Sequence, residues 1–341
     1  TESFPDDAER ERQKNTVFDR MVKVSVLTPL WNTPENFLRE MIESVQAQTY
    51  QNWELCLADG SDDAHAYVGE ICREYAKKDR RIVYKKLEKN GGIAENTNRC
   101  LEMATGEYVA PFDHDDLLHP CVLYEYVKVI NEKDADYIYC DEATFKNGDV
   151  NQMITMHFKP DYAIDNLRAN NYICHFSMFD KKLLEGTELY RTKFDGSQDH
   201  DMILRLTDKA RNVVHVPKLL YYWRQHAGSV SSGVEAKPYV VESARGAVAD
   251  HLRRHGFSNF KITSTRAFEP IFKITYEIIG EPKISIIIPN KDHVEDLRRC
   301  ITSIIEKSTY DTYELIVVEI YSESREIFAY YEELANNPAV K

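Results

Sequence analysis

The sequence has no surplus of positive charge, and this absence limits the partners it can bind. Its 43 Lys and Arg residues are outnumbered by 56 Asp and Glu residues, which gives a formal net charge of -13. A surface that binds nucleic acid or another polyanion through general charge attraction is therefore not expected. A local basic pocket for a phosphate group remains compatible with this balance.

Closely spaced cysteines are absent as well. The seven cysteines stand singly along the chain, none belongs to a Cys-x-x-Cys pair, and their number is odd. This pattern favours buried thiols in a reducing cytoplasm over a disulfide framework or a zinc site.

The sequence also lacks an apolar run approaching the ~20 residues that cross a bilayer, and it shows no signal peptide. We therefore expect a cytoplasmic protein, with peripheral association at the inner face of the membrane as a second expectation. The chain is rich in apolar and aromatic side chains: 43% of its 341 residues are hydrophobic, and 21 are Tyr. That composition predicts a globular chain with a large core and more than one domain.

Short β-branched runs alternate with amphipathic segments through the first 140 residues. Thr33 and Pro34 are the expected N-cap and first-turn residues of the first of these helices. Such alternation is typical of an α/β fold with a mainly parallel sheet flanked by helices. The expected strands are 22–29, 53–58, 81–84, 107–112 and 137–140, and the expected helices follow Thr33, run through Ile71 and Tyr75, and cover 94–104 and 120–132.

Polar clusters follow three of these strands. They are Trp31–Asn32, the segment D-G-S-D-D at 59–63, and the segment D-H-D-D at 113–116. Ligands of open parallel sheets bind at the carboxyl ends of the strands, so the three clusters are expected to converge there.

The third cluster gathers Asp113, Asp115 and Asp116 within four residues, directly after an apolar strand. Like charges at this spacing repel one another. A divalent cation such as Mg²⁺ or Mn²⁺ would offset the repulsion, since both ions prefer hard oxygen ligands. The alternative is an acidic turn that caps a helix and faces water.

The chain repeats part of itself. K-V-S-V-L-T-P at 23–29 recurs as K-I-S-I-I-I-P at 283–289, and T-Y-Q-N-W-E-L at 49–55 recurs as T-Y-D-T-Y-E-L at 309–315. Self-similarity of this length predicts a duplicated domain, of which the second copy is partial. The expected division is an N-terminal arm at 1–20, a first domain at 21–233, a helical segment and linker at 234–282, and a truncated second α/β unit at 283–341.

Several motifs in a fixed order resemble the inverting nucleotide-sugar glycosyltransferases of family 2, which have the GT-A fold (a Rossmann-like sheet with helices on both faces). The resemblance covers about the first 230 residues, and 283–320 resemble the start of a second such domain. It implies a hexosyltransferase of bacterial surface-glycan or glycoprotein synthesis. The matching motifs are V-S-V-L-T-P-L-W-N (24–32), L-A-D-G-S-D-D (57–63), N-G-G-I (90–93), G-E-Y-V-A-P-F-D-H-D-D (106–116), G-S-Q-D-H-D-M-I-L-R (196–205) and L-Y-Y-W-R-Q-H-A-G-S (220–229).

The resemblance implies a metal site at the acidic cluster. Asp115 is expected to bind Mn²⁺ or Mg²⁺ directly, with Asp113 on the metal or the donor ribose and His226 as a third ligand. Arg224 is expected to reach the donor diphosphate. Asp116 is expected to cap the following turn instead.

The resemblance also implies a nucleotide pocket and a general base. Trp31 is expected beside the uracil ring and Asp59 on the base N–H, with Pro29 and Asn98 also contacting the nucleotide. Asp199, in the Q-D-H-D segment, is expected to deprotonate the acceptor hydroxyl. The alternatives are core packing for Trp31, a turn aspartate at Asp59 and an ordinary first-turn carboxylate at Asp199.

The implied partners are a nucleotide sugar and a glycan or glycoprotein acceptor. A UDP-hexose donor is favoured, and a dTDP-sugar such as dTDP-rhamnose is the main rival. His175 is expected on the acceptor side. Because a half domain exposes a strand edge and an apolar face, we also expect that unit to pack on the first domain or to self-associate, with a dimer as the simplest form.

Two other functions fit parts of the pattern. A catalytically inert sugar- or nucleotide-binding module would need a broken site, yet the first copy keeps metal, stacking and base candidates together. A nucleotidyltransferase would want a Gly-rich loop with a basic residue after the first strand, and L-W-N-T-P at 30–34 is not one.

Overall fold

The computed structural model describes residues 4–146, 148–226, 238–266, 268–338 and 340–341. Its contacts divide the chain into two compact units, Thr1–Thr275 and Tyr276–Lys341. The boundary expected between 233 and 234 lies outside the described residues.

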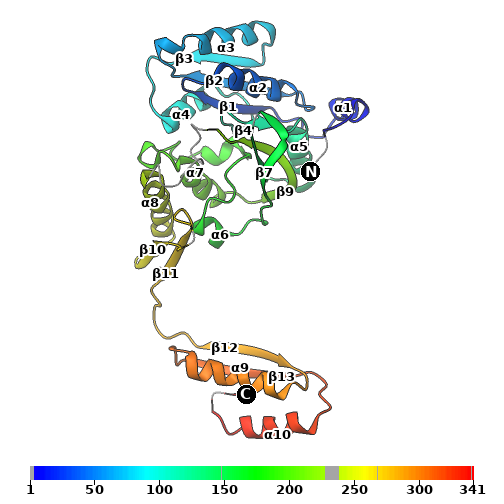
Figure 1. Cartoon of the computed structure of the whole chain (residues 1–341), viewed down its shortest axis with the longest axis vertical. Helices are drawn as coiled ribbons and strands as arrows, with labels where there is room; N and C mark the ends of the chain where they lie inside the picture. Colours follow the sequence, from blue (N-terminus) through cyan, green and yellow to red (C-terminus); the bar gives the residue numbers. More distant parts are fainter. Residues whose placement is uncertain (1–3, 147, 227–237, 267, 339) are drawn as a thin grey trace. The chain divides into compact units, whose positions relative to one another are not determined.

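The first unit is built on one large sheet with strand order β3-β2-β1-β4-β8-β6-β9-β5, and β7 pairs with β6 (Figure 1). Strands β1 to β4 are parallel to one another, which confirms the predicted mainly parallel α/β arrangement. The elements up to β6 are α1 (Asp7–Lys14), β1 (Val24–Leu30), α2 (Glu35–Gln46), β2 (Trp53–Asp59), a short 3-10 turn η1 (Asp63–His65), α3 (Tyr67–Lys78), β3 (Ile82–Lys86), α4 (Ile93–Met103), β4 (Tyr108–Pro111), β5 (Leu117–Leu118), α5 (Val122–Lys133) and β6 (Tyr137–Lys146).

Strand β1 shows why the sheet carries helices on both faces. Its alternate side chains point to opposite faces, as the period of a strand requires. Val24 and Val26 lie in one buried core with residues of α2, α3 and α5. Leu27 lies in a second core with residues of α4 and with elements that follow β6. All seven positions of β1 are buried, which explains its continuous apolar run.

Helix α2 has the predicted apolar face, since Leu38, Met41, Ile42 and Val45 are all buried. Its predicted cap is wrong. The helix begins at Glu35 after Pro34 without a side-chain cap. The hydroxyl of Thr33 instead forms a short hydrogen bond with the imidazole of His114, in the loop after β4.

The second half of the sheet departs from strand–helix alternation. Strand β8 lies between β4 and β6 and is antiparallel to both, while β9 is parallel to β6. Strands β5, β7, β8 and β9 are not among the strands expected from the sequence. The elements of this half are β7 (Asp149–His157), α6 (Ile164–Ala169), β8 (Ser177–Asp180), the 3-10 turns η2 (Lys181–Leu184) and η3 (Thr192–Phe194), α7 (Gln198–Thr207) and β9 (Val213–Arg224).

Helix α8 (Pro238–Arg254) and the hairpin of β10 (Phe260–Ser264) and β11 (Phe272–Tyr276) follow. Val248 and Leu252 of α8 and Phe272 of β11 lie in the same core as Leu204 of α7. These elements therefore cover the face of the sheet that carries α4 and α7. Among the described residues, no helix is long and apolar enough to cross a bilayer.

The second unit contains β12 (Ile284–Asn290), α9 (Val294–Lys307), β13 (Tyr313–Glu319) and α10 (Arg325–Leu334). Ile284 pairs with Tyr313 in register, as Val24 pairs with Trp53 in the first unit. The repeat in the sequence is thus a repeat of a β-α-β arrangement. Its apolar positions are less covered, however, because Ile284 is 49% exposed where Val24 is fully buried.

Candidate active site

The parallel register brings the polar clusters to one edge of the sheet. Leu30 at the end of β1 pairs with Asp59 at the end of β2, and Leu27 pairs with Pro111 near the end of β4. The loops are also tied together, since the backbone N–H of Asn32 donates to the hydroxyl of Ser61 at 2.9 Å. The convergence expected from the sequence is present.

The acidic cluster follows β4. One carboxylate oxygen from each of Asp113, Asp115 and Asp116 lies within 4.8 Å of the others. The Nε2 atom of His226, two residues after β9, lies 2.8 Å from Oδ2 of Asp115. The His226 ring packs against Phe37 of α2 with a centroid separation of 5.1 Å. The structure therefore brings the three predicted metal ligands, Asp113, Asp115 and His226, into one cluster.

Asp116 has a different role from its two neighbours. Its side chain is fully buried. One oxygen accepts a hydrogen bond from the Tyr221 hydroxyl, and the other accepts one from the backbone N–H of Arg224 at 2.7 Å. Burial and the nearby charges of Asp115 and Asp113 raise the pKa of Asp116 well above its usual range. Asp116 joins the loop after β4 to β9, so the expected turn cap is replaced by an anchor between strands.

Arg224 is buried beside the cluster. Its guanidinium donates to the backbone carbonyl of Asp115 and to the carboxylate of Glu40, both at 2.6 Å. It lies over the rings of Phe37 and Phe145 at 4.5 and 4.8 Å. These two bonds use Nε and one terminal nitrogen of the guanidinium. The role of Arg224 as a phosphate ligand stays a prediction.

The predicted nucleotide residues flank the ends of β1 and β2. Trp31 directly follows β1, and 43% of its surface is exposed, so it does not pack in the core. Asp59 is only 1% exposed. Its carboxylate accepts hydrogen bonds from the backbone N–H of Ser61 and the hydroxyl of Tyr84, both at 2.8 Å. Asp59 therefore shapes the turn before Gly60, which was the alternative interpretation, and its contact with a base stays a prediction.

Pro29 and Asn98 lie farther from open space. Pro29 is buried within β1, in register with Ala58. Both ends of the Asn98 amide are used in the protein, because it donates to the carbonyl of Tyr190 and accepts from the N–H of the same residue, each at 2.9 Å. Their contacts with a nucleotide also remain predictions.

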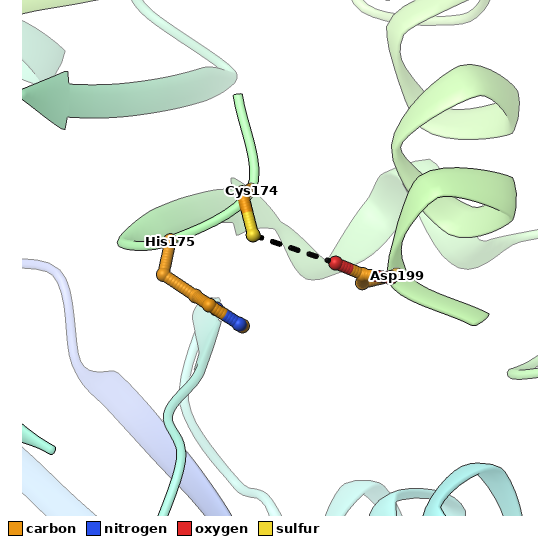
Figure 2. Close-up of side chains that lie close together, drawn as sticks. All are labelled: Cys174, His175 and Asp199. Atoms are coloured by element: carbon orange, nitrogen blue, oxygen red, sulfur yellow. Dashed lines mark hydrogen bonds between the residues drawn. The ribbon is translucent and has the colours of Figure 1, made fainter. Parts of the chain in front are cut away.

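Asp199 lies in the first turn of α7, next to the loop before β8. The side-chain amide of Asn171 donates to Oδ2 of Asp199 at 2.7 Å. The thiol of Cys174 lies 3.7 Å from the same oxygen, and Figure 2 shows its sulfur pointing toward the Asp199 carboxylate, with the ring of His175 alongside. Ligand atoms of Cys174, His175 and Asp199 all lie within 4.8 Å of one another.

His175 connects this cluster to the acidic cluster. Its Nε2 atom lies 3.2 Å from Oδ2 of Asp113. Burial opposes the charged form of both side chains. For His175 the neighbouring Cys174 and Asp113 outweigh burial and raise its pKa well above the usual value, and the attraction of His175 lowers the pKa of Asp113. The imidazole of His175 therefore contacts Asp113, the predicted donor-side carboxylate, and lies within 4.8 Å of Asp199, the predicted acceptor-side carboxylate.

Three residues at this link were not found from the sequence: Asn171, Lys159 and Glu142. Lys159 is buried, and its ammonium group contacts Glu142 and two carbonyl groups of the loop that carries His175. The only available signal was the polar Asn within the otherwise apolar segment N-Y-I-C-H-F at 171–176.

The donor atoms decide which groups could hold a hard cation. Asp113 and Asp115 offer oxygen atoms and His226 offers an imidazole nitrogen, a set that suits Mn²⁺ or Mg²⁺. A further group, Asp208 with His251 and His255, is less suited. Arg168 donates to Nε2 of His251, so a neutral His251 ring carries its proton on Nδ1, which faces Asp208. Neither ring nitrogen of His251 then offers a free lone pair to a metal ion.

Residues 25–187 match the model of the glycosyl transferase family 2. They belong to that family. The match begins in β1 and ends in the segment after β8, so it contains the strand ends and the acidic cluster. The family resemblance inferred from the motifs is confirmed for this part of the chain.

The chain is also similar to two longer bacterial proteins. It is 40% identical over 303 residues to the uncharacterized protein y4gI of Sinorhizobium fredii, and 30% identical over 319 residues to the O-antigen biosynthesis protein RfbC of Myxococcus xanthus. These alignments cover 87% and 93% of this chain but only 32% and 24% of the relatives. The chain therefore spans a third or less of the length of either relative.

The fold is shared with a solved structure. The chain aligns to the crystal structure of S. aureus TarS 1-349 in complex with UDP-GlcNAc with a TM-score of 0.55 and 21% identity, over 67% of this chain and 66% of that one. At this identity the likeness speaks for the fold. Together with the family match, it confirms the GT-A fold expected from the sequence.

Proposed function

We propose that this chain carries a metal-dependent inverting glycosyltransferase, which moves a hexose from a nucleotide-diphosphate sugar to a hydroxyl group of a glycan or glycoprotein. The observation that supports this most is the position of His175. Its Nε2 atom lies 3.2 Å from Asp113, one of the proposed metal ligands, and its ring lies within 4.8 Å of Asp199, the proposed base.

Asp113, Asp115 and His226 would hold Mn²⁺ or Mg²⁺. When bound, such an ion neutralises the donor diphosphate and stabilises it as a leaving group. The chain's own contribution is to fix the ligands. Asp116 holds the loop after β4 against β9, so the carboxylate of Asp115 and the imidazole of His226 stay within 2.8 Å of each other.

Asp199 would act as the general base. Its Oδ2 atom is held by Asn171, whereas Oδ1 accepts no hydrogen bond among the described residues. We assign Oδ1 to the acceptor hydroxyl. Asp199 takes the hydroxyl proton while the hydroxyl oxygen forms a bond to the anomeric carbon. The bond from that carbon to the diphosphate oxygen breaks on the opposite side, so one displacement inverts the configuration.

A uridine donor is favoured, and a dTDP-sugar is the rival. Trp31 offers an exposed ring beside the end of β2, where a base could stack. The TarS structure was solved with UDP-GlcNAc, and the relative RfbC is named for O-antigen biosynthesis. We therefore propose a bacterial surface polysaccharide as the acceptor. A cytoplasmic location, peripheral contact with the membrane and self-association remain predictions.

A donor screen tests this proposal. UDP-GlcNAc, UDP-glucose, UDP-galactose, GDP-mannose and dTDP-rhamnose would each be incubated with the protein, with MnCl₂ or with EDTA. We expect release of the nucleoside diphosphate from one donor class in MnCl₂ only. Binding of UDP without turnover of any donor would favour an inert binding module, and pyrophosphate release from UTP would favour a nucleotidyltransferase.

A further inference from the structure

The loop at 171–176, between α6 and β8, contacts both sides of the proposed site. Asn171 and Cys174 face Asp199, while His175 faces Asp113. A sugar and an acceptor hydroxyl that react must meet between the metal ligands and the base. This loop therefore sets the separation of the two groups that the reaction requires.

The orientation of the Asn171 amide is determined by its second contact. Its Oδ1 atom accepts a hydrogen bond from the backbone N–H of Cys174 at 3.2 Å, so its NH₂ group must point to Asp199. The 2.7 Å hydrogen bond that results is donated to a carboxylate, which makes it stronger than a bond between neutral groups. This hydrogen bond holds Oδ2 of Asp199, whereas Oδ1 faces away from Asn171.

A buried ammonium group fixes the loop from behind. The side chain of Lys159 is 3% exposed, and it donates to Glu142 of β6 at 2.9 Å. It also donates to the carbonyl of Ile173 at 2.7 Å and to the carbonyl of His175. These two carbonyls flank Cys174. The loop is thus joined to the central sheet at the point where it faces the base.

The base is held on its own side as well. His200 and Asp201, the two residues after Asp199 in α7, are buried. The Nε2 atom of His200 lies 2.7 Å from the carbonyl of Leu167, and Asp201 pairs with Arg205 at 2.8 Å. Since both the loop and the first turn of α7 are fixed, the side-chain rotamer of Asp199 is the remaining freedom, and Asn171 restricts it.

We infer that Asn171 is the positioning residue of the base, and that the Lys159–Glu142 pair holds the loop from which it acts. This inference rests on the proposed role of Asp199. It assigns no contact with substrate to Asn171, Lys159 or Glu142. Positioning of a reacting group within an ångström is worth up to about 100-fold in rate.

The test compares Asn171→Ala with Asn170→Ala. The neighbouring Asn170 donates to the side chain of Asn166 at 3.1 Å and does not contact the base, so it is a matched control. The readouts are kcat for nucleoside diphosphate release from the donor with the highest turnover in the screen, UDP affinity in MnCl₂ by calorimetry, and a crystal structure of each variant. Asp199→Asn is measured in parallel.

We expect Asn171→Ala to lose about 10- to 100-fold in kcat, with UDP affinity within twofold of the wild type and a rotated Asp199 carboxylate. Asn170→Ala should match the wild type. The inference is overturned if Asn171→Ala has a kcat within twofold of the wild type or an unchanged Asp199 rotamer. If Asp199→Asn has a low kcat in the same experiment, the assignment of Asp199 as the base still stands. If Asp199→Asn turns over normally, the proposed function itself has the wrong base.

The anchor is tested with a paired variant, because Lys159→Met alone would leave Glu142 buried without its ammonium partner and hydrogen-bonded, among the described residues, only to His157. Lys159→Met/Glu142→Gln removes both charges together. We expect a folded protein by circular dichroism with a kcat lowered like that of Asn171→Ala. Wild-type kcat in this folded double variant would contradict the anchoring role.

Discussion

The imidazole of His226 and the carboxylate of Asp115 lie 2.8 Å apart, although 111 positions separate them in the sequence. The contact forms because β9 is followed by His226 and β4 is followed by Asp115, and Asp116 joins the two segments through the N–H of Arg224. The proposed metal site therefore depends on the close approach of the segments that follow β4 and β9.

Substitution at this contact should weaken the metal-dependent binding of the donor. We expect Asp115→Asn to lower UDP affinity in MnCl₂ by more than about tenfold, since it removes a charged oxygen ligand. His226→Ala should have a smaller effect in the same direction. The measurement is calorimetric titration of UDP with MnCl₂ and with EDTA.

Asp165→Asn provides the control for this experiment, because the Asp165 side chain is 86% exposed on α6 and outside the proposed site. It should bind UDP like the wild type. If Asp115→Asn also binds UDP like the wild type in MnCl₂, Asp115 is not a metal ligand.

Removal of the base should affect turnover and spare binding. We expect Asp199→Asn to lower kcat by about 10²- to 10⁴-fold, with UDP affinity in MnCl₂ nearly unchanged. The substitution keeps the shape of the side chain beside Asn171. An equal loss of UDP affinity and turnover would mean that Asp199 acts on donor binding.

Acid stability should depend on Asp79, just after α3. Hydrogen bonds from Arg81 are the main cause that lowers the pKa of Asp79 to about 2, from an ordinary value of 3.8. A lowered pKa contributes stability that is present above pH 3.8 and is lost as the pH falls toward 2. We expect Asp79→Asn to lose about 1–2 kcal/mol of unfolding free energy at pH 7.

Urea denaturation at several pH values measures this effect. The difference between Asp79→Asn and the wild type should shrink as the pH falls from 4 toward 2. Asp19→Asn, at an exposed position, should show no difference at any pH. A loss in Asp79→Asn that is the same at pH 7 and near pH 2 would contradict the ion-pair account.

The first unit should carry the activity by itself. Every proposed site residue lies before Thr275, where the first compact unit ends. A chain shortened to residues 1–275 should therefore keep its circular dichroism spectrum and its turnover of the donor. A folded 1–275 chain without turnover would show that the second unit contributes to the site.

The meeting of the polar clusters could be predicted from the sequence for a physical reason. Parallel strands end at a common edge, so Trp31, Asp59 and the acidic cluster are expected close together from the sequence alone. Family motifs then located Asp199 and His226. The parallel arrangement on which this expectation depends is confirmed for β1 to β4.

The contacts around Arg224 and Asn171 could not be predicted in the same way. Arg224 is paired with Glu40, 184 positions away, and no local pattern announces that partner. Asn171 reaches Asp199 because the antiparallel strand β8 enters the sheet between β4 and β6. An antiparallel insertion breaks the strand–helix periodicity on which the prediction depended, so the loop before β8 had no expected position.

The anomeric configuration of the first product tests the central claim most directly. Donor hydrolysis would be followed by proton NMR, with Mg²⁺ in place of the paramagnetic Mn²⁺, and with water as the acceptor. Metal-dependent displacement with Asp199 as the only base predicts that the sugar first appears with the configuration opposite to that of the donor, and that EDTA stops the reaction. A first product with retained configuration, or equal turnover in EDTA, would contradict the account.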